Sequence, residues 1–356
     1  MRIPFLLLLV ISLISCGKKT DNHQDHQVVL SGISSELDSL LTEENKEGRF
    51  NGTVLVGRGD SLLLTKAYGV ADNSTKEPLN TTSVFYMGSL AKQFTSMSIM
   101  LLEADGKLSF DDPIITYLPE LEKTVGGITI RQMMNHTSGL PDYYALGIFK
   151  EGMRNADVLK AMTEIDSLDF EPNAEYSYSN SAYVLLSIIA ERVSGKSFGA
   201  FLNEKVFLPL NMLNTVVYDE TKPEISHRVK GHNEDGSLND YNAFTTGGGG
   251  IFSNVEDMYL WDRALYQDKV INQEKLQGAF TPAVLSNDSL SYYGFGWMLD
   301  KDFPGQVRHS GSLAGFRTYI FRDTKSKTVI ILLSNFTNNA SALTNKIRDV
   351  LAEKKE

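Results

Sequence analysis

GTVLVGRGDSLLLTKAY, residues 52–68, contains two β-prone runs separated by a short polar turn. The runs, residues 52–58 and 61–68, lie on either side of Gly59 and Asp60. A Gly-Asp pair between two such runs is a hairpin signal. The stretch therefore predicts two adjacent antiparallel strands near the start of the chain.

A second stretch of the same kind, FRTYIFRDTKSKTVIILLS, occupies residues 316–334 near the other end. Its β-prone runs are residues 316–322 and 328–334, and helical patterns at 33–44 and 340–353 lie outside the two hairpins. Since hairpins make neighbouring strands antiparallel, we expect one antiparallel sheet built from both chain ends, and not a doubly wound parallel sheet.

The middle of the chain has a different pattern. Residues 118–277 are mostly helical candidates, and residues 181–193 carry the clearest apolar face. We therefore expect an α/β (α+β) sandwich with flanking helices, formed by residues 28–117 and 278–356, with an all-helical subdomain inserted at 118–277. A functional site would then lie in the seam between the two parts.

Residues 1–15 are expected to be a lipoprotein signal peptide. Their apolar stretch, residues 3–14, is too short to span a bilayer as a helix. It ends at Leu13-Ile14-Ser15-Cys16, which resembles the lipobox of bacterial lipoproteins, so Cys16 would become the lipidated N-terminus. An ordinary cleaved signal with an incidental cysteine is the alternative. Residues 16–27 would be the lipidated cysteine and a flexible tether, which places the protein on a membrane of the cell envelope.

Composition limits the classes of partner. With 356 residues and 42% hydrophobic content, the chain can bury one large core or two smaller ones. The formal charge of -10 speaks against a nucleic-acid partner, because phosphate binding needs clustered Lys and Arg. Cys16 is the only cysteine, which excludes a disulfide within the chain.

Ser89-Leu-Ala-Lys92 places a hydroxyl and an amine three residues apart in a stretch of helical character. Positions i and i+3 share one helix face, so Lys92 can take the proton of Ser89, a weak nucleophile without a base. Burial would lower the pKa of Lys92 toward that role. Gly88 supplies a tight turn that exposes the hydroxyl. The alternative is a helix N-cap serine followed by a solvated lysine.

Tyr178-Ser-Asn180 stands just before the predicted helix at 181–193. A tyrosine acts as a base only if a cation lowers its pKa, and Lys92 is the candidate. Asn180 is expected to hold a substrate amide or the Lys92 ammonium. The alternatives are a core position for Tyr178 and a helix-cap role for Asn180.

His309-Ser310-Gly311 precedes the second hairpin and is expected on an edge strand that faces the seam. Such an edge can hydrogen-bond an extended acyl substrate along its backbone, and Gly311 would let that substrate approach closely. The backbone N–H near Ser312 would join that of Ser89 in an oxyanion hole. For a single histidine such as His309, a structural role is the usual alternative.

These three motifs, in this order, resemble the signatures of the penicillin-recognising serine hydrolases, in the branch of class C β-lactamases and D-alanyl-D-alanine carboxypeptidases. Other stretches agree, among them ITIRQMMNHTSGLPDY at 128–143, EPNAEYSYSN at 171–180 and YGFGW at 293–297. The similarity covers about residues 28–350.

The resemblance implies a β-lactamase/DD-peptidase-like sandwich with an all-α insertion. It also implies that Ser89 is acylated and then released by water, with Lys92 and Tyr178 moving protons. It implies no cofactor and no metal, and the histidines of the chain offer no HExxH or equivalent zinc spacing.

One departure from the family pattern bears on the substrate. In β-lactamases the third motif usually starts with lysine, whose charge helps to bind the substrate carboxylate, whereas His309 is mostly neutral near pH 7. A dedicated β-lactamase is therefore less favoured than a D-amino-acid peptidase or an esterase.

Several other residues are interpreted as structural. His136 is expected to serve a turn, and glycines 247–250 to form a close-packed backbone segment. Asn173 and Asn211 are expected at turns where asparagine tolerates left-handed geometry.

Two classes of function remain. The first is a lipid-anchored serine hydrolase that acts through Ser89 on an amide, peptide or ester, with a D-alanyl-D-alanine carboxypeptidase or esterase ahead of a β-lactamase. The second is a non-catalytic, penicillin-binding-like protein that recognises D-amino-acid peptides or a protein partner. Intact Ser89, Lys92 and Tyr178 favour the first class.

Overall fold

A computed structural model describes residues 22–121, 125, 127–219, 224–337 and 340–353. The predicted signal peptide and Cys16 lie outside these residues. None of the helices in the described part of the chain is long and apolar enough to cross a lipid bilayer.

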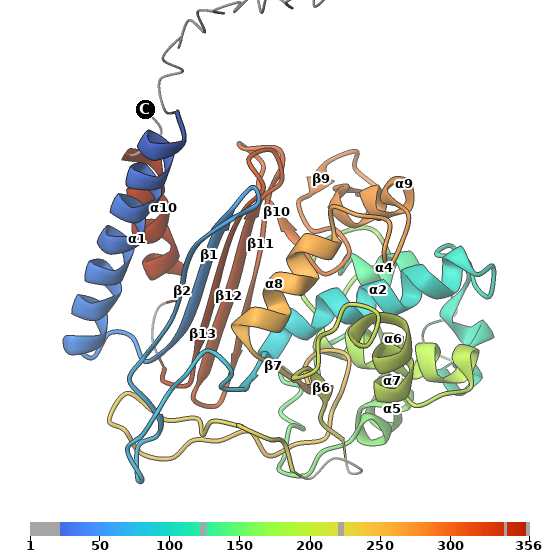
Figure 1. Ribbon diagram of the computed structural model, residues 1–356. Coiled ribbons are helices and arrows are strands. Elements are labelled where there is room, and N and C mark those ends of the chain that lie inside the picture. The colour runs from blue at the N-terminus through green and yellow to red at the C-terminus, as the bar shows by residue number, and fades with distance from the viewer. Residues whose placement is uncertain (1–21, 122–124, 126, 220–223, 338–339, 354–356) are drawn as a thin grey trace, which may run out of the picture.

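A six-stranded antiparallel sheet, in the order β10-β11-β12-β13-β1-β2, runs through the described part of the molecule (Figure 1). Its strands are β1 (Gly52–Arg58), β2 (Ser61–Tyr68), β10 (Met298–Leu299), β11 (Gln306–Leu313), β12 (Phe316–Asp323) and β13 (Thr328–Ser334). β1 pairs with β13 along its whole length, from Gly52 opposite Ser334 to Arg58 opposite Thr328. The predicted sheet from both chain ends is confirmed, because the two hairpins meet along this pair of strands.

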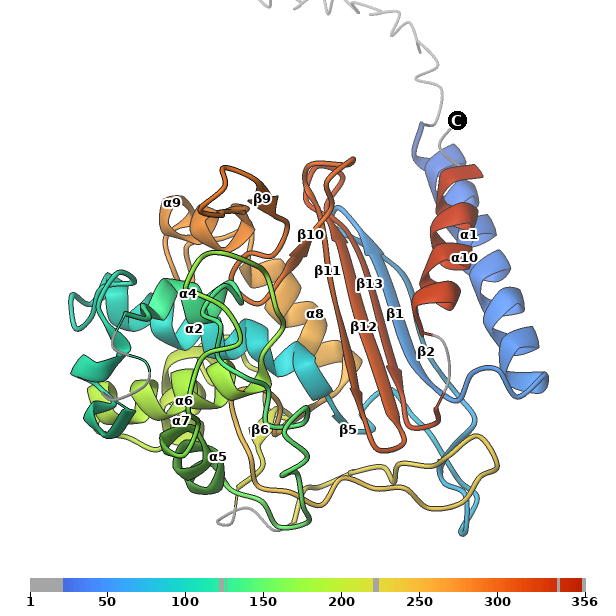
Figure 2. The ribbon, with the colours of Figure 1, turned by 180° about the vertical axis from the view of Figure 1, so that it is seen from behind.

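The outer face of the sheet is covered by α1 (Asn22–Lys46) and α10 (Ala340–Glu353), which lie on the side away from the other helices (Figure 2). Val56 of β1 and Ile330 of β13 belong to the cluster that packs under these helices, whereas Leu55 and Ile331 belong to the cluster on the opposite face. Successive side chains point to opposite faces of a strand, and here both faces are buried. This explains why the central strands are apolar without alternation.

The first helix is longer than its pattern predicts. It begins at Asn22, so residues 22–27 are helical where the sequence indicated a tether, and the predicted helix 33–44 is its packed part. Once a helix is nucleated, each further residue adds a hydrogen bond at small entropic cost. A polar segment without apolar periodicity can therefore extend a packed helix.

Most of the helices lie on the inner side of the sheet (Figure 2). They are α2 (Ala91–Ala104), α4 (Ile130–Met134), α5 (Asn155–Thr163), α6 (Asn180–Ser194), α7 (Phe198–Leu202), α8 (Val255–Ala264) and α9 (Gln273–Leu276). Shorter elements connect them: β3 (Val70–Asp72), β4 (Glu77–Pro78), β8 (Ala283–Val284), β9 (Leu290–Ser291), η1 (Gly88–Leu90), η2 (Ile114–Thr116), η3 (Pro119–Leu121), the π-helical turn η4 (Asn203–Phe207) and η5 (Gln277–Phe280).

The predicted helical region is confirmed with two differences. It contains the strands β6 (Val216–Val217) and β7 (Ile251–Ser253), which pair with β5 (Phe85–Tyr86) in a three-stranded sheet. Strands this short carry no period-two pattern in the sequence. In addition, α8 packs directly against β1 and β13, so it belongs to the sandwich although its residues lie within 118–277.

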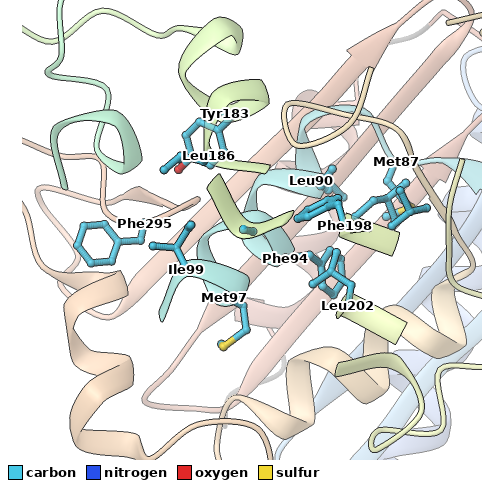
Figure 3. Close-up of a cluster of buried hydrophobic side chains, with 14 of the residues drawn as sticks. Met87, Leu90, Phe94, Met97, Ile99, Tyr183, Leu186, Phe198, Leu202 and Phe295 are labelled. Atoms are coloured by element: carbon cyan, nitrogen blue, oxygen red, sulfur yellow. The ribbon is translucent and has the colours of Figure 1, made fainter. Parts of the chain in front are cut away.

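The helix α2 is buried inside the larger hydrophobic cluster. Figure 3 shows Phe94, Met97 and Ile99 of α2 among side chains that include Leu186 of α6 and Leu202 of α7. A helix enclosed in this way has little freedom to shift, because protein interiors are close-packed. The start of α2 is therefore a rigid position at which the chain can hold reactive groups.

Candidate active site

Ser89 lies in η1, the single turn that leads from β5 into α2. Gly88, just before it, has φ +54° and approaches β11 so closely that a Cβ there would lie 2.8 Å from the Ser312 backbone nitrogen. Only glycine fits this left-handed conformation and this contact. Neither η1 nor α2 has a side-chain cap hydrogen bond, so the N-cap interpretation of Ser89 is wrong.

Lys92 is fully buried beneath Ser89, so the interpretation as a solvated lysine is also wrong. Its Nζ donates to Ser89 Oγ at 3.1 Å, to Asn180 Oδ1 at 2.7 Å and to the Gly248 carbonyl oxygen at 2.8 Å. Burial lowers the pKa of Lys92 to about 7. The negative charge of Asp142 acts in the opposite direction and raises this pKa, but its effect is smaller than that of burial. The amine therefore exchanges its proton near neutral pH.

Tyr178 lines the cleft in front of Lys92 and is not a core aromatic. The Lys92 Nζ lies 4.7 Å from the centre of its ring. Burial raises the pKa of Tyr178 well above its ordinary value, and a hydrogen bond with Ser89 lowers it only in part. The expectation that Lys92 lowers this pKa is wrong, because desolvation penalises the phenolate and Lys92 itself is readily neutral. Tyr178 is a neutral phenol at physiological pH.

Asn180 is the first residue of α6, and its side chain points to Lys92. The cap of this helix is Ser179, whose Oγ accepts from the Ala182 backbone N–H at 3.2 Å, so the cap interpretation of Asn180 is wrong by one residue. The expected contact between Asn180 and Lys92 is present.

The strand β11 forms one wall of the site. β12 pairs with it over its whole length, but β10 covers only Val307 and Arg308, so residues 309–313 have no strand partner on that side among the described residues. Ser310 and Ser312 are exposed and line the cleft. The edge-strand expectation is met only in part, because β10 is the edge strand of the sheet and β11 is its neighbour.

Gly311 has a different role from the predicted one. A Cβ at this position would overlap with the Met87 carbonyl oxygen and with Thr318 Oγ1, which donates to that same carbonyl at 2.7 Å. Gly311 therefore lets the turn that carries Ser89 approach β11. It does not face the substrate cleft, because its missing side chain would point at the protein's own backbone.

His309 is enclosed and has no free ring nitrogen for a substrate. Its Nε2 lies 2.9 Å from the Tyr293 hydroxyl and its Nδ1 lies 2.7 Å from the Ser310 carbonyl oxygen. The carbonyl only accepts, so the proton sits on Nδ1 and Tyr293 donates to Nε2. Burial lowers the pKa of His309 to about 3, with a further lowering by the Lys92 charge. The ring is thus neutral, as expected, but a direct hydrogen bond to substrate is not available to it.

The cleft has a volume of about 480 Å³. Its lining is aromatic and neutral: Tyr86, Gly88, Ser89, Tyr143, Tyr144, Tyr176, Tyr178, Asn180, Thr245, Gly248, Gly249, Met298, His309, Ser310, Ser312 and Leu313. Among the described residues, no Lys, Arg, Asp or Glu side chain lines this cleft. A substrate there meets aromatic rings and uncharged hydrogen-bonding groups.

The glycine segment and His136 pack against residues that line the cleft. Gly249 packs so closely on the Tyr86 hydroxyl that a Cβ would overlap with it. His136 is buried with φ +61°, accepts from the Ser179 backbone N–H at 3.1 Å and packs 4.3 Å from the Tyr178 ring centre. These contacts agree with the structural interpretations.

The left-handed turns predicted at Asn173 and Asn211 are present, with φ +70° and +59°.

Two residues of the site, Gly248 and Asp142, were not predicted from the sequence. Gly248 contributes only a carbonyl group, for which a sequence carries no signal. Asp142 binds the backbone and side chain of Asn180 through Oδ2 at 3.0 and 2.7 Å. It lies in the stretch at 128–143 that carries part of the family resemblance. An acidic residue in that stretch was the only signal in the sequence that could have indicated a role at the site.

No group of three or more His, Cys, Asp or Glu side chains within the described residues is placed to hold a metal ion.

Comparisons with known proteins show the family and the fold. The sequence pattern of the Beta-lactamase family matches residues 37–354. A penicillin-binding protein of Bacillus subtilis (strain 168) is 37% identical over 328 residues, which cover 84% of this chain and 71% of that protein.

Two solved structures share the fold. EstCE1, described as a hydrolase with promiscuous acyltransferase activity, superposes with a TM-score of 0.77 at 20% identity over 91% of this chain and 99% of that chain. D-amino acid amidase from Ochrobactrum anthropi SV3, complexed with L-phenylalanine amide, superposes with a TM-score of 0.75 at 21% identity over 93% and 100% of the two chains. At these identities the likeness concerns the fold alone.

Proposed function

We propose that this chain, which belongs to the β-lactamase family, is a serine hydrolase that works through an acyl-enzyme at Ser89. One observation carries the proposal: the buried Lys92 amine contacts Ser89 Oγ at 3.1 Å and is held by Asn180 Oδ1 and the Gly248 carbonyl oxygen. A lysine that is buried, close to neutral and aimed at a serine is an activated nucleophile pair.

The geometry around Lys92 suits a general base. A neutral amine has two N–H donors and one lone pair, and the two oxygens of Asn180 and Gly248 accept both donors. The lone pair then points to the remaining contact, Ser89 Oγ. Because the pKa of Lys92 is about 7, raising the pH through neutrality supplies this reactive form.

In the acylation step, Tyr178 carries a proton from Lys92 to the leaving group. Ser89 Oγ attacks the acyl carbon as its proton passes to Lys92, and the carbonyl oxygen becomes an oxyanion near the backbone N–H groups of Ser89 and Ser312. Tyr178, hydrogen-bonded to Ser89 and stacked on Lys92, gives its phenol proton to the leaving group and regains one from the Lys92 ammonium. Water then attacks the ester between Ser89 and the acyl group. The protons move among the same groups in the reverse direction, and Ser89 is released.

The neutral cleft supports esters or amides whose leaving group carries no charge. A D-alanyl-D-alanine carboxypeptidase or a β-lactamase must accept a carboxylate beside the bond it breaks. Within the described residues the cleft offers no cation to receive one, since His309 is neutral with both nitrogens occupied and Lys92 is covered. We therefore place an esterase or amidase ahead of those two activities.

The test is a measurement of intact protein mass and of turnover with four probes. Wild-type protein and Ser89→Ala are exposed to a fluorophosphonate, a p-nitrophenyl ester, a D-amino acid amide and a penicillin. We expect one phosphonyl adduct on wild type only, and ester hydrolysis about 10³-fold faster in wild type than in Ser89→Ala. Ser39→Ala, an exposed serine of α1, is the matched control and should behave as wild type.

The other outcomes separate the alternatives. A persistent penicillin adduct on Ser89 would favour a D-peptidase, and rapid penicillin turnover would favour a β-lactamase. If no probe gives an adduct or turnover that depends on Ser89, the catalytic proposal is wrong and non-catalytic recognition of a D-amino-acid peptide or a protein partner takes its place.

We also propose, from the sequence pattern alone, that Cys16 carries a lipid that anchors the protein to a membrane of the cell envelope. Replacing Cys16 by serine should move the protein from the membrane fraction to the soluble fraction, because stable anchoring depends on the buried acyl chains. The measurement is immunodetection in both fractions, with Ser12→Ala as the control. Equal partitioning of Cys16→Ser and wild type would leave only an ordinary cleaved signal.

A further inference from the structure

Asp142 lies on the segment that follows α4 and contacts the first residue of α6. Its Oδ2 accepts from the Asn180 backbone N–H at 3.0 Å and from Asn180 Nδ2 at 2.7 Å, while Oδ1 accepts from the Tyr144 backbone N–H at 2.8 Å. A carboxylate at the start of a helix is favoured by the unpaired N–H groups and the helix dipole. Asp142 is not among the residues that line the cleft. It acts on the site only through what it binds.

The carboxylate sets the orientation of the Asn180 amide. A carboxylate only accepts hydrogen bonds, so it selects the amide nitrogen of Asn180. The amide oxygen must then face the opposite direction, where it lies 2.7 Å from Lys92 Nζ. With the amide turned over, its N–H would face Lys92 instead.

This orientation decides what the Lys92 lone pair can do. An amide N–H pointing at a neutral amine would donate to its lone pair, which the proton of Ser89 would then not reach. An amide oxygen instead accepts one N–H of the amine and directs the lone pair toward Ser89 Oγ, at 3.1 Å. We propose that Asp142 is a positioning residue that holds the Asn180 oxygen on Lys92, so that the amine lone pair remains available to Ser89. The inference rests on the proposed acyl-enzyme function.

Asp142 also supplies the charge that acts on Lys92. Four other titratable groups of the described residues surround the amine, and each is neutral. Burial raises the pKa of the tyrosines, Tyr178 and Tyr183, and lowers the pKa of the histidines, His136 and His309. The carboxylate of Asp142 raises the pKa of Lys92, which burial lowers. Removing the charge therefore lowers this pKa further.

The experiment compares pH profiles of wild type, Asp142→Asn, Asp142→Ala and Asp142→Glu. In Asp142→Asn we expect the acid limb of kcat/KM for the p-nitrophenyl ester to move to lower pH by about half a unit to one unit. The alkaline plateau should fall about tenfold in Asp142→Asn and about 100-fold in Asp142→Ala, since the amide is less firmly oriented. Asp142→Glu keeps the charge and should keep the midpoint near that of wild type. Asp60→Asn, an exposed residue of the β1–β2 turn, is the charge-matched control.

A second readout does not depend on turnover. The Lys92 Cε resonance, labelled with ¹³C and assigned with Lys92→Arg, reports the lysine pKa directly in folded wild type and Asp142→Asn. Equal midpoints in the two proteins, or a higher midpoint in Asp142→Asn, would overturn the inference. If wild type shows no turnover dependent on Ser89 but the lysine midpoint still falls, the hydrolase proposal has failed and the link between Asp142 and Lys92 stands. A loss of activity in Asp142→Ala without any midpoint shift in Asp142→Asn would reduce Asp142 to a structural residue.

Discussion

Replacing Lys92 by methionine is expected to lower kcat/KM for ester hydrolysis by about 10³- to 10⁴-fold, because Ser89 loses its base. Methionine has a similar length and no charge, so it can occupy the fully buried space that Lys92 fills. The acceptors on Asn180 and Gly248 lose their donor, while the cost of burying an amine disappears. The free energy of unfolding should therefore stay within about 2 kcal/mol of wild type.

Two further lysine variants sharpen this test. Lys92→Arg keeps a positive charge at every accessible pH and should be inactive even at alkaline pH, since guanidinium does not release its proton. Lys107→Met changes a lysine that follows the same helix and is half exposed, and it should hydrolyse the ester like wild type. The measurements are steady-state kinetics over pH 5 to 10, with a thermal melt of each variant. Activity of Lys92→Met within tenfold of wild type would remove Lys92 from the mechanism.

Replacing Gly311 by alanine is expected to lower kcat/KM about 100-fold, although the side chain never enters the cleft. The added Cβ would overlap with the Met87 carbonyl oxygen, a backbone atom two residues before Ser89. Relief of that overlap must shift η1, and with it Ser89, away from Lys92. The hydrogen bond from Thr318 to Met87 would be strained as well, which adds a loss of stability of about 1 to 3 kcal/mol.

The control for this substitution is a glycine with free space. Gly32 lies exposed in α1, and outside its own helix backbone and chain neighbours no atom of the described side chains lies within 4 Å of an added Cβ. Gly32→Ala should therefore stabilise the protein by about 0.5 to 1 kcal/mol and leave kinetics unchanged. Denaturant unfolding and ester kinetics on both variants make the comparison. If Gly311→Ala keeps full activity, the close approach of η1 to β11 is not what places Ser89.

The sheet could be predicted because its signals are local. The turn of each hairpin is indicated by a few consecutive residues, and the strands at 52–58 and 328–334 have the bounds that the sequence predicted. The sequence predicted one sheet from both chain ends, but it did not predict that β1 and β13 are the strands that join the two hairpins; that pairing is a finding of the structure. The helical bounds were less accurate at α1, and β6 and β7 were missed, since neither a helix extension nor a two- or three-residue strand leaves a periodic pattern.

The sequence predicted which residues form the candidate site better than it predicted their protonation states and orientations. Ser89, Lys92, Tyr178 and Asn180 do meet in one place, as the motifs indicated. The role of Gly311 was misjudged, because only the contact of two backbones reveals which way its missing side chain points.

The amino-acid sequence by itself determined the antiparallel sheet from both chain ends, the position of Ser89 at the start of a helix and the family to which the chain belongs. These properties depend on spacing along the chain. The tertiary structure alone decided the protonation states and orientations: a Lys92 whose pKa is lowered by burial, a neutral Tyr178, a His309 with both nitrogens occupied, and an Asn180 amide fixed by Asp142. The physical reason is that a pKa and an amide orientation depend on desolvation and on hydrogen-bond partners, and those partners come from segments far apart in the sequence.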